Sequence, residues 1–415
     1  MKREKYDLIV IGAGAAGIIA AITAAREGKS VLILEKLSTI SAKLKATGGG
    51  RCNLTNTLDS EHFMKEFGRD GRFMQDALHA FSNQALIDFM QEIGVATHAP
   101  DGFRIFPTSH SSATIIDALL KEMQRCNIEV ITKQRAQRLL TVGEHMEGVK
   151  TQERNFYASN IIVATGGLGY PQLGAEGDGY QMAEELGHKV TELSPAMMPL
   201  KTEERWVAAC RADTIPKVTM HVALKKHKKL KAEGDLIFTK SGIRGPVVLD
   251  FAREITPLLK KYGKVPLLMN LTKGLNEEEI RKHLKDQATL HPDAPLLTLL
   301  MTLLPEALSK ELCKLANVDP KHKLKKIVPK AFAKLISLLA WTPLTINDHD
   351  GFRLAMITRG GISLKEIDPK TMQSKKVQGL YFCGEIMNLD GPCGGYNLQW
   401  SFSSGHLAGK LLKSN

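Results

Sequence analysis

The sequence predicts an α/β protein in which a βαβ core is interrupted by a β-rich insertion and a group of helices. Residues 8–34 form the pattern of an apolar strand, a glycine turn, an Ala-rich helix and a second apolar strand. Strand-like alternation then dominates residues 189–269, with an expected turn at Glu233–Gly234. Helical periodicity dominates 276–341, and Asn276 with Glu279 three positions later predicts a capping box at its start. We therefore expect a discontinuous first domain (1–188 and 346–415), an inserted β-rich domain (189–275 with 342–345) and a helical cap (276–341).

The first strand and helix enclose the pattern Gly12-x-Gly14-x-x-Gly17, and Glu35 stands at the end of the second strand, 18 residues after Gly17. Gly12 permits the tight turn, Gly14 lets the backbone touch a pyrophosphate, and Gly17 lets the helix lie against the strand. The helix N-terminus then faces the phosphates. Glu35 accepts hydrogen bonds from ribose hydroxyls and would repel a 2′-phosphate. This segment predicts a dinucleotide site that disfavours NADP.

Three further segments have the character of cofactor-binding loops. The first, "ATGGGRCNLTN" (46–56), contains three consecutive glycines, which suggests a backbone that a ligand approaches closely. The second, "NIIVATGG" (160–167), is an apolar strand that ends in glycines. The third combines "VQGLYFCGE" (377–385) with "GGYNLQWSFSSGHLAG" (394–409), a strand followed by a C-terminal helix. Together they resemble the two-dinucleotide-binding-domain flavoproteins, whose chain returns to FAD three times.

The resemblance becomes closer when five motifs are combined. "TGGGRCNLTN", "GDGYQMAEELGH", "LIFTKSGIRGPVVL", "MITRGGISLKEI" and "GLYFCGE" with "GGYN" are similar to those of the BaiN-like, or aminoacetone-oxidase-like, bacterial flavoprotein family, over nearly the whole chain. The resemblance implies a Rossmann-like FAD-binding domain of the glutathione-reductase/fumarate-reductase type and non-covalent FAD. Members of that family act on different substrates, so the resemblance names none.

The resemblance also implies roles for single residues. The triple glycine would run beneath the flavin, and Arg51 and Asn53 would order the loop near the isoalloxazine. Lys43 would approach the pyrophosphate, and Glu385 would hold the ribityl-pyrophosphate region. The N-terminus of the C-terminal helix would face the flavin O2 edge and stabilise negative charge there. The predicted FAD contacts are Gly12, Gly14, Ala15, Ala16, Gly17, Glu35, Lys36, Lys43, Thr47, Gly48, Gly49, Gly50, Arg51, Cys52, Asn53, Ala136, Thr165, Gly166, Gly167, Gly384, Glu385, Gly395, Tyr396, Asn397 and Leu398.

Catalytic side chains are not identified by the sequence. Cys52 would need a base or a second thiol to act as a reagent, and none is adjacent in sequence, so we expect it to pack beside the cofactor. Arg104 either holds an anionic or carbonyl substrate group or forms a structural ion pair. Acid or base candidates are His110, Tyr170 and Tyr396, each equally consistent with a core or surface role.

The absence of certain motifs limits which molecules could exchange electrons with the flavin. No second strand–GxGxxG–helix unit follows, and no C-x-x-C or C-x-x-x-x-C pair follows the first βαβ unit, which disfavours a dedicated nicotinamide domain and a disulfide reductase. We expect hydride transfer between a small organic substrate and flavin N5, with O2 or transiently bound NAD(P)H as the second reactant. No metal site is expected. Alternatives are a tRNA-modifying flavoprotein and a non-catalytic flavin-binding sensor.

Composition limits location and partners. The uncharged run Leu8–Ala25 is divided by glycines, so it predicts strand and helix rather than a membrane span. Six cysteines without a C-x-x-C pair suggest a reduced, cytoplasmic protein.

The chain of 415 residues has a net charge of +12, with basic runs at Lys225–Lys231 and Lys321–Lys326. We expect these runs to be a solvated hairpin tip and a helix face, with nucleic-acid binding the less favoured interpretation. The oligomeric state is left open.

Overall fold

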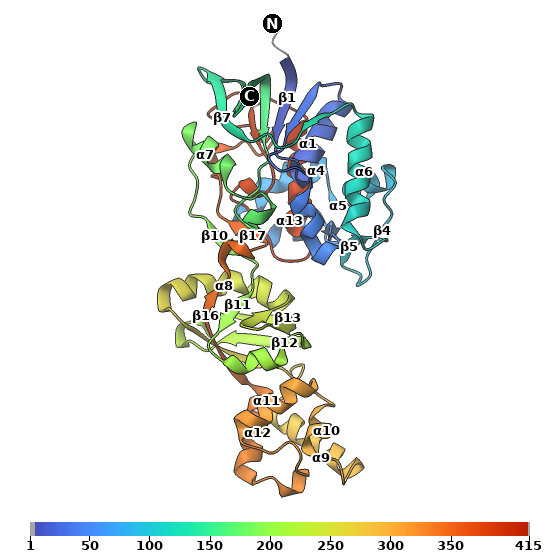
Figure 1. Cartoon of the computed structure of the whole chain (residues 1–415), viewed down its shortest axis with the longest axis vertical. Helices are drawn as coiled ribbons and strands as arrows, with labels where there is room; N and C mark the ends of the chain where they lie inside the picture. The colour runs from blue at the N-terminus through green and yellow to red at the C-terminus, as the bar shows by residue number, and fades with distance from the viewer. Residues whose placement is uncertain (1–4, 414–415) are drawn as a thin grey trace. The chain divides into compact units, whose positions relative to one another are not determined.

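The computed structural model describes residues 5–413, which divide into two compact units (Figure 1). Unit 1 combines the chain up to Pro195 with the chain from Met356 onward, and unit 2 is Ala196–Ala355. Each unit has its own hydrophobic core. The insertion was predicted at residues 189–345 as a β-rich domain with a helical cap; unit 2 is the compact segment 196–355 and contains both the barrel and the helices.

Unit 1 is organised around a sheet with the strand order β6-β2-β1-β9-β8-β7, in which β18 also pairs with β9. The pairs among β6, β2, β1, β9 and β18 are parallel, whereas β7 and β8 form an antiparallel extension. Parallel central strands are buried on both faces, which is why their sequences are continuous apolar runs. Their bounds are β1 (Lys5–Ile11), β2 (Val31–Leu34), β6 (Glu129–Ile131), β7 (Ala136–Val142), β8 (His145–Thr151), β9 (Asn155–Val163) and β18 (Leu380–Phe382).

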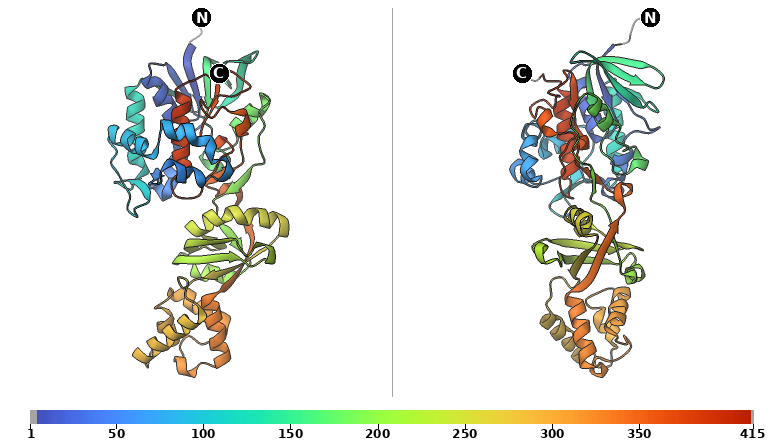
Figure 2. Two further views of the ribbon diagram at one scale, coloured as in Figure 1. Left: turned by 180° about the vertical axis from the view of Figure 1, so that it is seen from behind. Right: turned by 90° about the vertical axis from the view of Figure 1, so that its left-hand side faces the viewer.

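Helices α1 (Ala15–Arg26) and α13 (Tyr396–Gly409) come from opposite ends of the chain and pack against each other (Figure 2). Their approach depends on glycine, because a Cβ at Gly405 would lie 2.3 Å from the Ala16 carbonyl oxygen. This contact brings the last helix to the first cofactor motif. The other elements of unit 1 are α2 (Ala42–Ala46), β3 (Thr55–Asn56), α3 (Ser60–Lys65), α4 (Gln75–Ala80), α5 (Asn83–Glu92), β4 (Thr97–His98), β5 (Arg104–Pro107), α6 (Ser112–Arg125), α7 (Asp178–Glu185) and β17 (Ile357–Arg359), and β10 (Ser194–Ala196) leads into unit 2.

Unit 2 contains a closed barrel with the strand order β11-β14-β13-β12-β15-β16. The predicted turn at Glu233–Gly234 is wrong: both residues lie within β13, and the hairpin turn is the lysine-rich segment 223–230. Pairing of β16 with β15 and β11 extends to His349, so residues 346–349 belong to the barrel and not to the cofactor domain. The bounds are β11 (Leu200–Thr202), β12 (Thr214–Val222), β13 (Lys231–Phe238), β14 (Gly242–Arg244), α8 (Pro246–Tyr262), β15 (Val265–Asn270) and β16 (Thr342–His349).

Four helices complete unit 2: α9 (Glu277–Leu290), α10 (Leu296–Leu300), α11 (Glu306–Ala316) and α12 (Pro329–Ala340). Helix α9 begins with the predicted capping box, in which the Asn276 side chain accepts from the amide of Glu279 and the Glu279 carboxylate accepts from the amide of Asn276. The basic run Lys321–Lys326 lies in the connection between α11 and α12, not on a helix face as predicted. Within residues 5–413, no helix has the length and apolar character needed to span a membrane.

Candidate functional site

The glycines that open α1 have the geometry of a dinucleotide turn. Gly12 has a φ of +102°, and a Cβ there would lie 2.7 Å from the Ala164 carbonyl oxygen. A Cβ at Gly17 would lie 2.0 Å from the Gly12 carbonyl oxygen, so the helix sits directly against the turn. A Cβ at Gly14 would meet nothing within 4 Å, which leaves the first turn of α1 open on that side. The turn therefore presents a helix N-terminus to an open surface.

Glu35 is fixed beside this turn. Its carboxylate accepts from the backbone amides of Ala13 and Leu37, each at 2.9 Å. Each oxygen keeps a further lone pair with which to accept from a ribose hydroxyl. Lys36 forms two ion pairs instead: its Nζ lies 2.7 Å from the Asp178 carboxylate and 3.1 Å from the Glu176 carboxylate. The predicted contact at Lys36 therefore competes with two ion pairs.

The triple glycine follows α2 as a left-handed turn. Gly48, Gly49 and Gly50 have φ values of +57°, +66° and +88°, which disfavour L side chains. A Cβ at Gly49 or Gly50 would meet nothing within 4 Å, whereas one at Gly48 would lie 3.0 Å from the Asn53 amide nitrogen. The turn thus exposes bare backbone to open space, as a surface beneath a flat ring requires.

Two asparagines tie this turn to the C-terminal segment. With its amide nitrogen facing the carbonyl groups of Thr55 and Ile105 (3.0 and 3.2 Å), Asn53 accepts from the Gly395 amide at 2.9 Å. Asn56 donates to the Gly394 carbonyl oxygen at 3.0 Å. Sequence reasoning gave Asn53 only a general ordering role and missed Asn56. The available signal was the presence of two asparagines within residues 53–56, because side-chain amides often fix loops.

Lys43 and Glu385, predicted to serve neighbouring parts of the cofactor, form an ion pair with 2.6 Å between Nζ and Oε2. The other Glu385 oxygen accepts from the Thr358 amide at 2.9 Å. Gly167 lies against this group, since a Cβ there would be 2.7 Å from the Glu385 carboxylate. Among residues 5–413, none forms a hydrogen bond with the buried Thr165 hydroxyl, which lies against Gly179 of α7. Each of the three predicted cofactor-binding segments therefore contributes a polar side chain to unit 1: Asn53, Thr165 and Glu385.

Cys52 is fully buried, with 0% exposure. Burial raises the pKa of its thiol to about 11, although a hydrogen bond with Thr47 acts in the opposite direction. A thiol with such a pKa remains protonated at neutral pH and is a poor nucleophile. These observations agree with the expected packing role of Cys52.

Two of the four catalytic candidates, Arg104 and His110, lie beside the Phe106 ring. Arg104 is held by Asp101, with 2.5 Å between Nε and Oδ2, so the structural ion pair left open by the sequence is present. The His110 ring packs near Phe106, with 6.2 Å between centroids. Tyr396 is 5% exposed and packs on Phe63, with 4.9 Å between centroids. Burial of Tyr396 favours packing over acid–base chemistry.

Arg51 and Arg104 both lie near the Phe106 ring, but Arg51 also contacts the backbone of the triple-glycine turn. It is exposed, its Nε donates to the Gly48 carbonyl oxygen at 3.3 Å, and its guanidinium lies 5.4 Å from the Phe106 centroid. Arg104 lies 5.9 Å from the centroid of the same ring. Tyr170 has a φ of +58° and precedes a short 3₁₀ turn. The remaining predicted positions divide by exposure: Ala16, Gly17, Ala136 and Gly384 are buried, and Ala15, Thr47, Gly166, Asn397 and Leu398 are partly exposed.

These features fit FAD. The open α1 N-terminus suits a pyrophosphate, Glu35 suits a ribose, and the bare left-handed turn suits a planar ring. Among the described residues, no cluster of His, Cys, Asp or Glu has the arrangement of a metal site.

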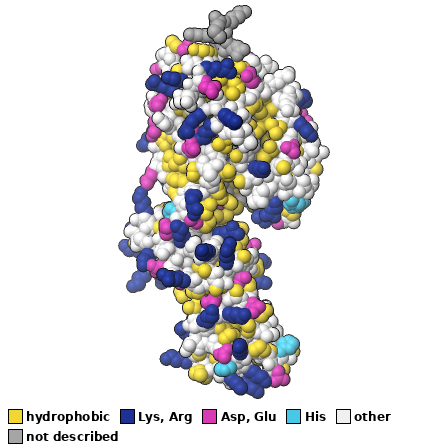
Figure 3. Space-filling model, viewed as in Figure 1, with side chains coloured by type: hydrophobic (Ala, Val, Ile, Leu, Met, Phe, Trp, Pro, Cys, Tyr) yellow, Lys and Arg dark blue, Asp and Glu magenta, His cyan; other side chains and the backbone are white. Residues whose placement is uncertain are grey.

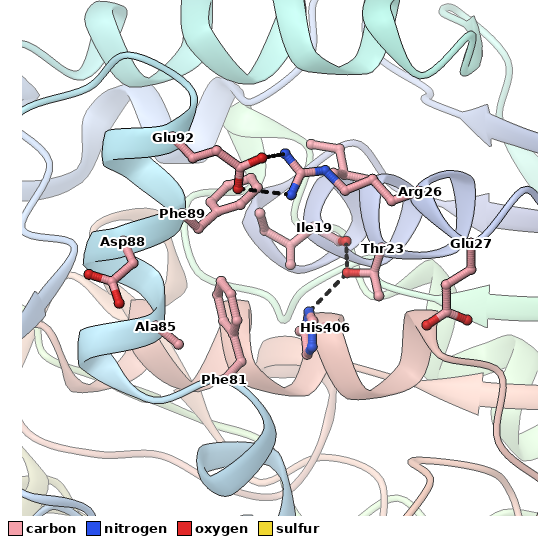
Figure 4. A pocket seen from close by; sticks show the side chains of 11 residues that line it. Ile19, Thr23, Arg26, Glu27, Phe81, Ala85, Asp88, Phe89, Glu92 and His406 are labelled. Carbon is pink, nitrogen blue, oxygen red and sulfur yellow. Dashed lines mark hydrogen bonds and ion pairs between the residues drawn. The ribbon is translucent and has the colours of Figure 1, made fainter.

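A separate pocket of about 420 Å³ lies between α1, α5 and α13 (Figure 4). Thr23 donates to the Ile19 carbonyl oxygen and lies 3.1 Å from His406 Nδ1, and the Phe81 ring stacks on the imidazole with 4.6 Å between centroids. The pocket is lined by the C-terminal half of α1 and by none of the predicted cofactor residues. It is therefore distinct from the candidate FAD site.

Comparison with known proteins supports the same class. The family model described as "HI0933-like protein Rossmann domain" matches residues 6–411. The 3-dehydro-bile acid delta(4,6)-reductase of Clostridium scindens is 31% identical over 405 residues, covering 97% of each chain. The ribosomal RNA dihydrouridine synthase of Escherichia coli is 29% identical over 404 residues, covering 97% of this chain and 96% of that one.

A solved structure shares the fold. The open conformation of a flavocytochrome c3 fumarate reductase aligns with a TM-score of 0.53 and 17% identity, covering 98% of this chain and 78% of that chain. The fold and the site thus define an FAD-dependent oxidoreductase with fumarate-reductase-type architecture. Within that class the chain belongs to the HI0933-like family, and the predicted fold and family resemblance are confirmed.

Proposed function

We propose that this protein reduces a carbon–carbon double bond conjugated to a carbonyl group. The observation that carries the proposal is the joining of the triple-glycine turn to the N-terminus of α13 through Asn53 and Asn56. The names of the two relatives with full-length similarity point to the same chemistry, since a delta(4,6)-reductase and a dihydrouridine synthase both saturate a conjugated double bond. Non-covalent FAD is the expected cofactor.

The chemistry that reduced FAD would supply at this site is transfer of a hydride to one carbon of the double bond, with a proton from solvent completing the saturated product. The protein supplies position and charge. The positive end of the α13 dipole stabilises negative charge beside Gly395, and the Lys43–Glu385 pair orders the segment that precedes the turn. Arg51, on the exposed side of the turn, donates to the substrate carbonyl oxygen. NAD(P)H, as a transient donor, would reduce the cofactor between turnovers.

Two substrate classes fit this reaction: a small enone, and the uracil ring of RNA. The second is favoured by one observation, the concentration of positive charge in unit 2. Its 160 residues hold 28 Lys and Arg against 17 Asp and Glu, a net charge of +11. A polyanionic substrate is attracted to such a surface, whereas a neutral enone gains nothing from it.

Anaerobic mixing tests the reaction. The FAD-loaded protein, photoreduced without oxygen, is mixed with 2-cyclohexenone, a steroid dienone and a uridine-containing oligonucleotide. We expect at least one of them to reoxidise the flavin and to gain two hydrogen atoms by mass spectrometry. Arg51→Met should slow that step about 10- to 100-fold, as expected for loss of a charged hydrogen bond. Flavin that is reoxidised by oxygen alone would contradict the proposal.

A further inference from the structure

Positive charge is strongly segregated between the two units. Unit 2 carries a net charge of +11, whereas unit 1 has 28 Lys and Arg against 27 Asp and Glu. On the face shown in Figure 3, Lys and Arg side chains spread over the barrel and the helices of unit 2. Solubility does not require this partition, because charge spread over both units would serve equally.

The densest part is a surface that we call the tip patch. It comprises Lys225, Lys226, His227, Lys228 and Lys229 in the β12–β13 hairpin, and Lys260, Lys261 and Tyr262 at the end of α8. The two segments are held together, since His227 Nε2 lies 3.2 Å from the Tyr262 hydroxyl and the Ala223 amide donates to the Pro266 carbonyl oxygen at 2.8 Å. All six lysines are exposed.

A helix C-terminus accounts for only part of this patch. Cations at the end of α8 interact favourably with the helix dipole, which explains Lys260 and Lys261. The four hairpin lysines have no such reason to gather. Residues 223–231 contain no acidic side chain, and the nearby Lys264 is already paired with Glu203.

The patch also contains an exposed aromatic ring. Tyr262 is 40% exposed, and Lys261 Nζ lies 5.2 Å from its centroid. The ring is fixed from one side by His227, with 5.8 Å between centroids. An aromatic ring held within a lysine cluster is the arrangement by which proteins bind single-stranded nucleic acid: ammonium groups contact phosphates and a base stacks on the ring.

We propose that the tip patch binds RNA, with the hairpin lysines on the phosphates and an unpaired base stacked on Tyr262. The inference deepens the proposed function and rests on its second substrate class. Chemistry favours RNA over an acidic membrane. Membrane-surface segments insert several exposed aliphatic or aromatic side chains, whereas among residues 5–413 Tyr262 is the only exposed large hydrophobic side chain in the patch.

Fluorescence anisotropy with a labelled oligouridylate tests the proposal on the full-length, FAD-loaded protein. Replacing the four hairpin lysines with Ala should reduce the slope of log affinity against log salt by up to about 3, since each phosphate contact on a single strand contributes about 0.7. Tyr262→Ala should weaken binding roughly 5- to 100-fold, whereas Tyr262→Phe, which keeps the ring, should stay within about threefold.

Two controls make the result specific. Lys325→Ala/Lys326→Ala removes basic side chains from another part of unit 2 and should leave most of the affinity. Reoxidation of the reduced flavin by 2-cyclohexenone should be unchanged in the tip-patch variants, so loss of RNA binding is distinguished from failure of the proposed reaction. Equal weakening by the control variant, equal binding by Tyr262→Ala, or binding to anionic vesicles but not to oligouridylate would overturn the proposal.

Discussion

Units 1 and 2 differ in their sequence signals: unit 1 contains specific glycine motifs, whereas unit 2 carries an excess of positive charge. Unit 1 is nearly neutral, and its distinctive residues are glycines whose missing side chains leave room beside the backbone. Unit 2 is strongly basic, and its barrel and helices are held by an ordinary apolar core. The comparison teaches that cofactor motifs are visible at single positions of the sequence, whereas the basic character of unit 2 is visible only in its overall composition.

The largest expected effect is on the triple glycine. Gly49→Val should give a folded but colourless protein whose melting temperature does not rise with added FAD, because the side chain enters the open space assigned to the ring. Gly94→Val is the matched control, since Gly94 also has a positive φ and open space around its Cβ. A yellow Gly49→Val protein with normal FAD affinity would contradict the site.

The second-largest expected effect is a loss of stability of unit 1 at low pH. Burial, with smaller contributions from Lys410 and Arg26, lowers the pKa of His406 to about 4. The unfolded chain therefore binds a proton more readily, and stability should fall as the pH drops from about 6.5 towards 4, by about 2–3 kcal/mol for this group. His406→Gln should flatten the dependence in urea unfolding. Exposed His79→Gln should not, and an unchanged slope in the His406 variant would argue against the buried neutral imidazole.

A smaller effect is expected for the helices of unit 2. Asn276→Ala removes the side-chain half of the capping box at α9, the acceptor for the Glu278 and Glu279 amides, and should cost about 1 kcal/mol. Unfolding followed by tryptophan fluorescence should report the loss, while the flavin spectrum and FAD affinity stay as in the wild type. A change in FAD affinity would show that the two units are coupled more tightly than their separate cores suggest.

The smallest effect concerns Cys52. Cys52→Ala should leave the rate of flavin reduction within a few-fold, because a buried thiol with a pKa of about 11 supplies no thiolate. Single-turnover reduction by dithionite and by NADPH measures this directly. A loss of a hundredfold or more would assign the thiol a chemical role after all.

Local rules made the core of unit 1 predictable. The strand, turn and helix around Gly12 and Gly17 are set by neighbours in sequence, so the βαβ unit could be predicted closely. The pairing of Asn56 with Gly394 could not, because it joins positions 338 residues apart. The association of Lys43 with Glu385 was missed for the same reason, although each residue was singled out.

In unit 2 the turn and boundary were mispredicted because the alternation of apolar and polar residues is not interrupted by clear turn signals. Glu233 and Gly234 look like a turn, but Gly234 is tolerated inside β13 because it lies against Val247 of α8. Closure of the barrel depends on β11 pairing with both β14 and β16, which no local pattern reveals. The end of β16 at His349 follows from that closure, so the boundary near 346 was placed too early.

The pairing of β18 with β9 and the packing of α13 on α1 have a consequence for synthesis. While the ribosome makes the barrel and its helices, the face of α1 that packs on α13, with Ala16, Ala20 and Thr23, lacks its partner from the end of the chain. Its completion requires closure of a very long loop, a slow step that leaves hydrophobic surface open to aggregation. Chains shortened just before α13 should therefore depend on chaperones, and FAD should be retained only after the last helix has emerged.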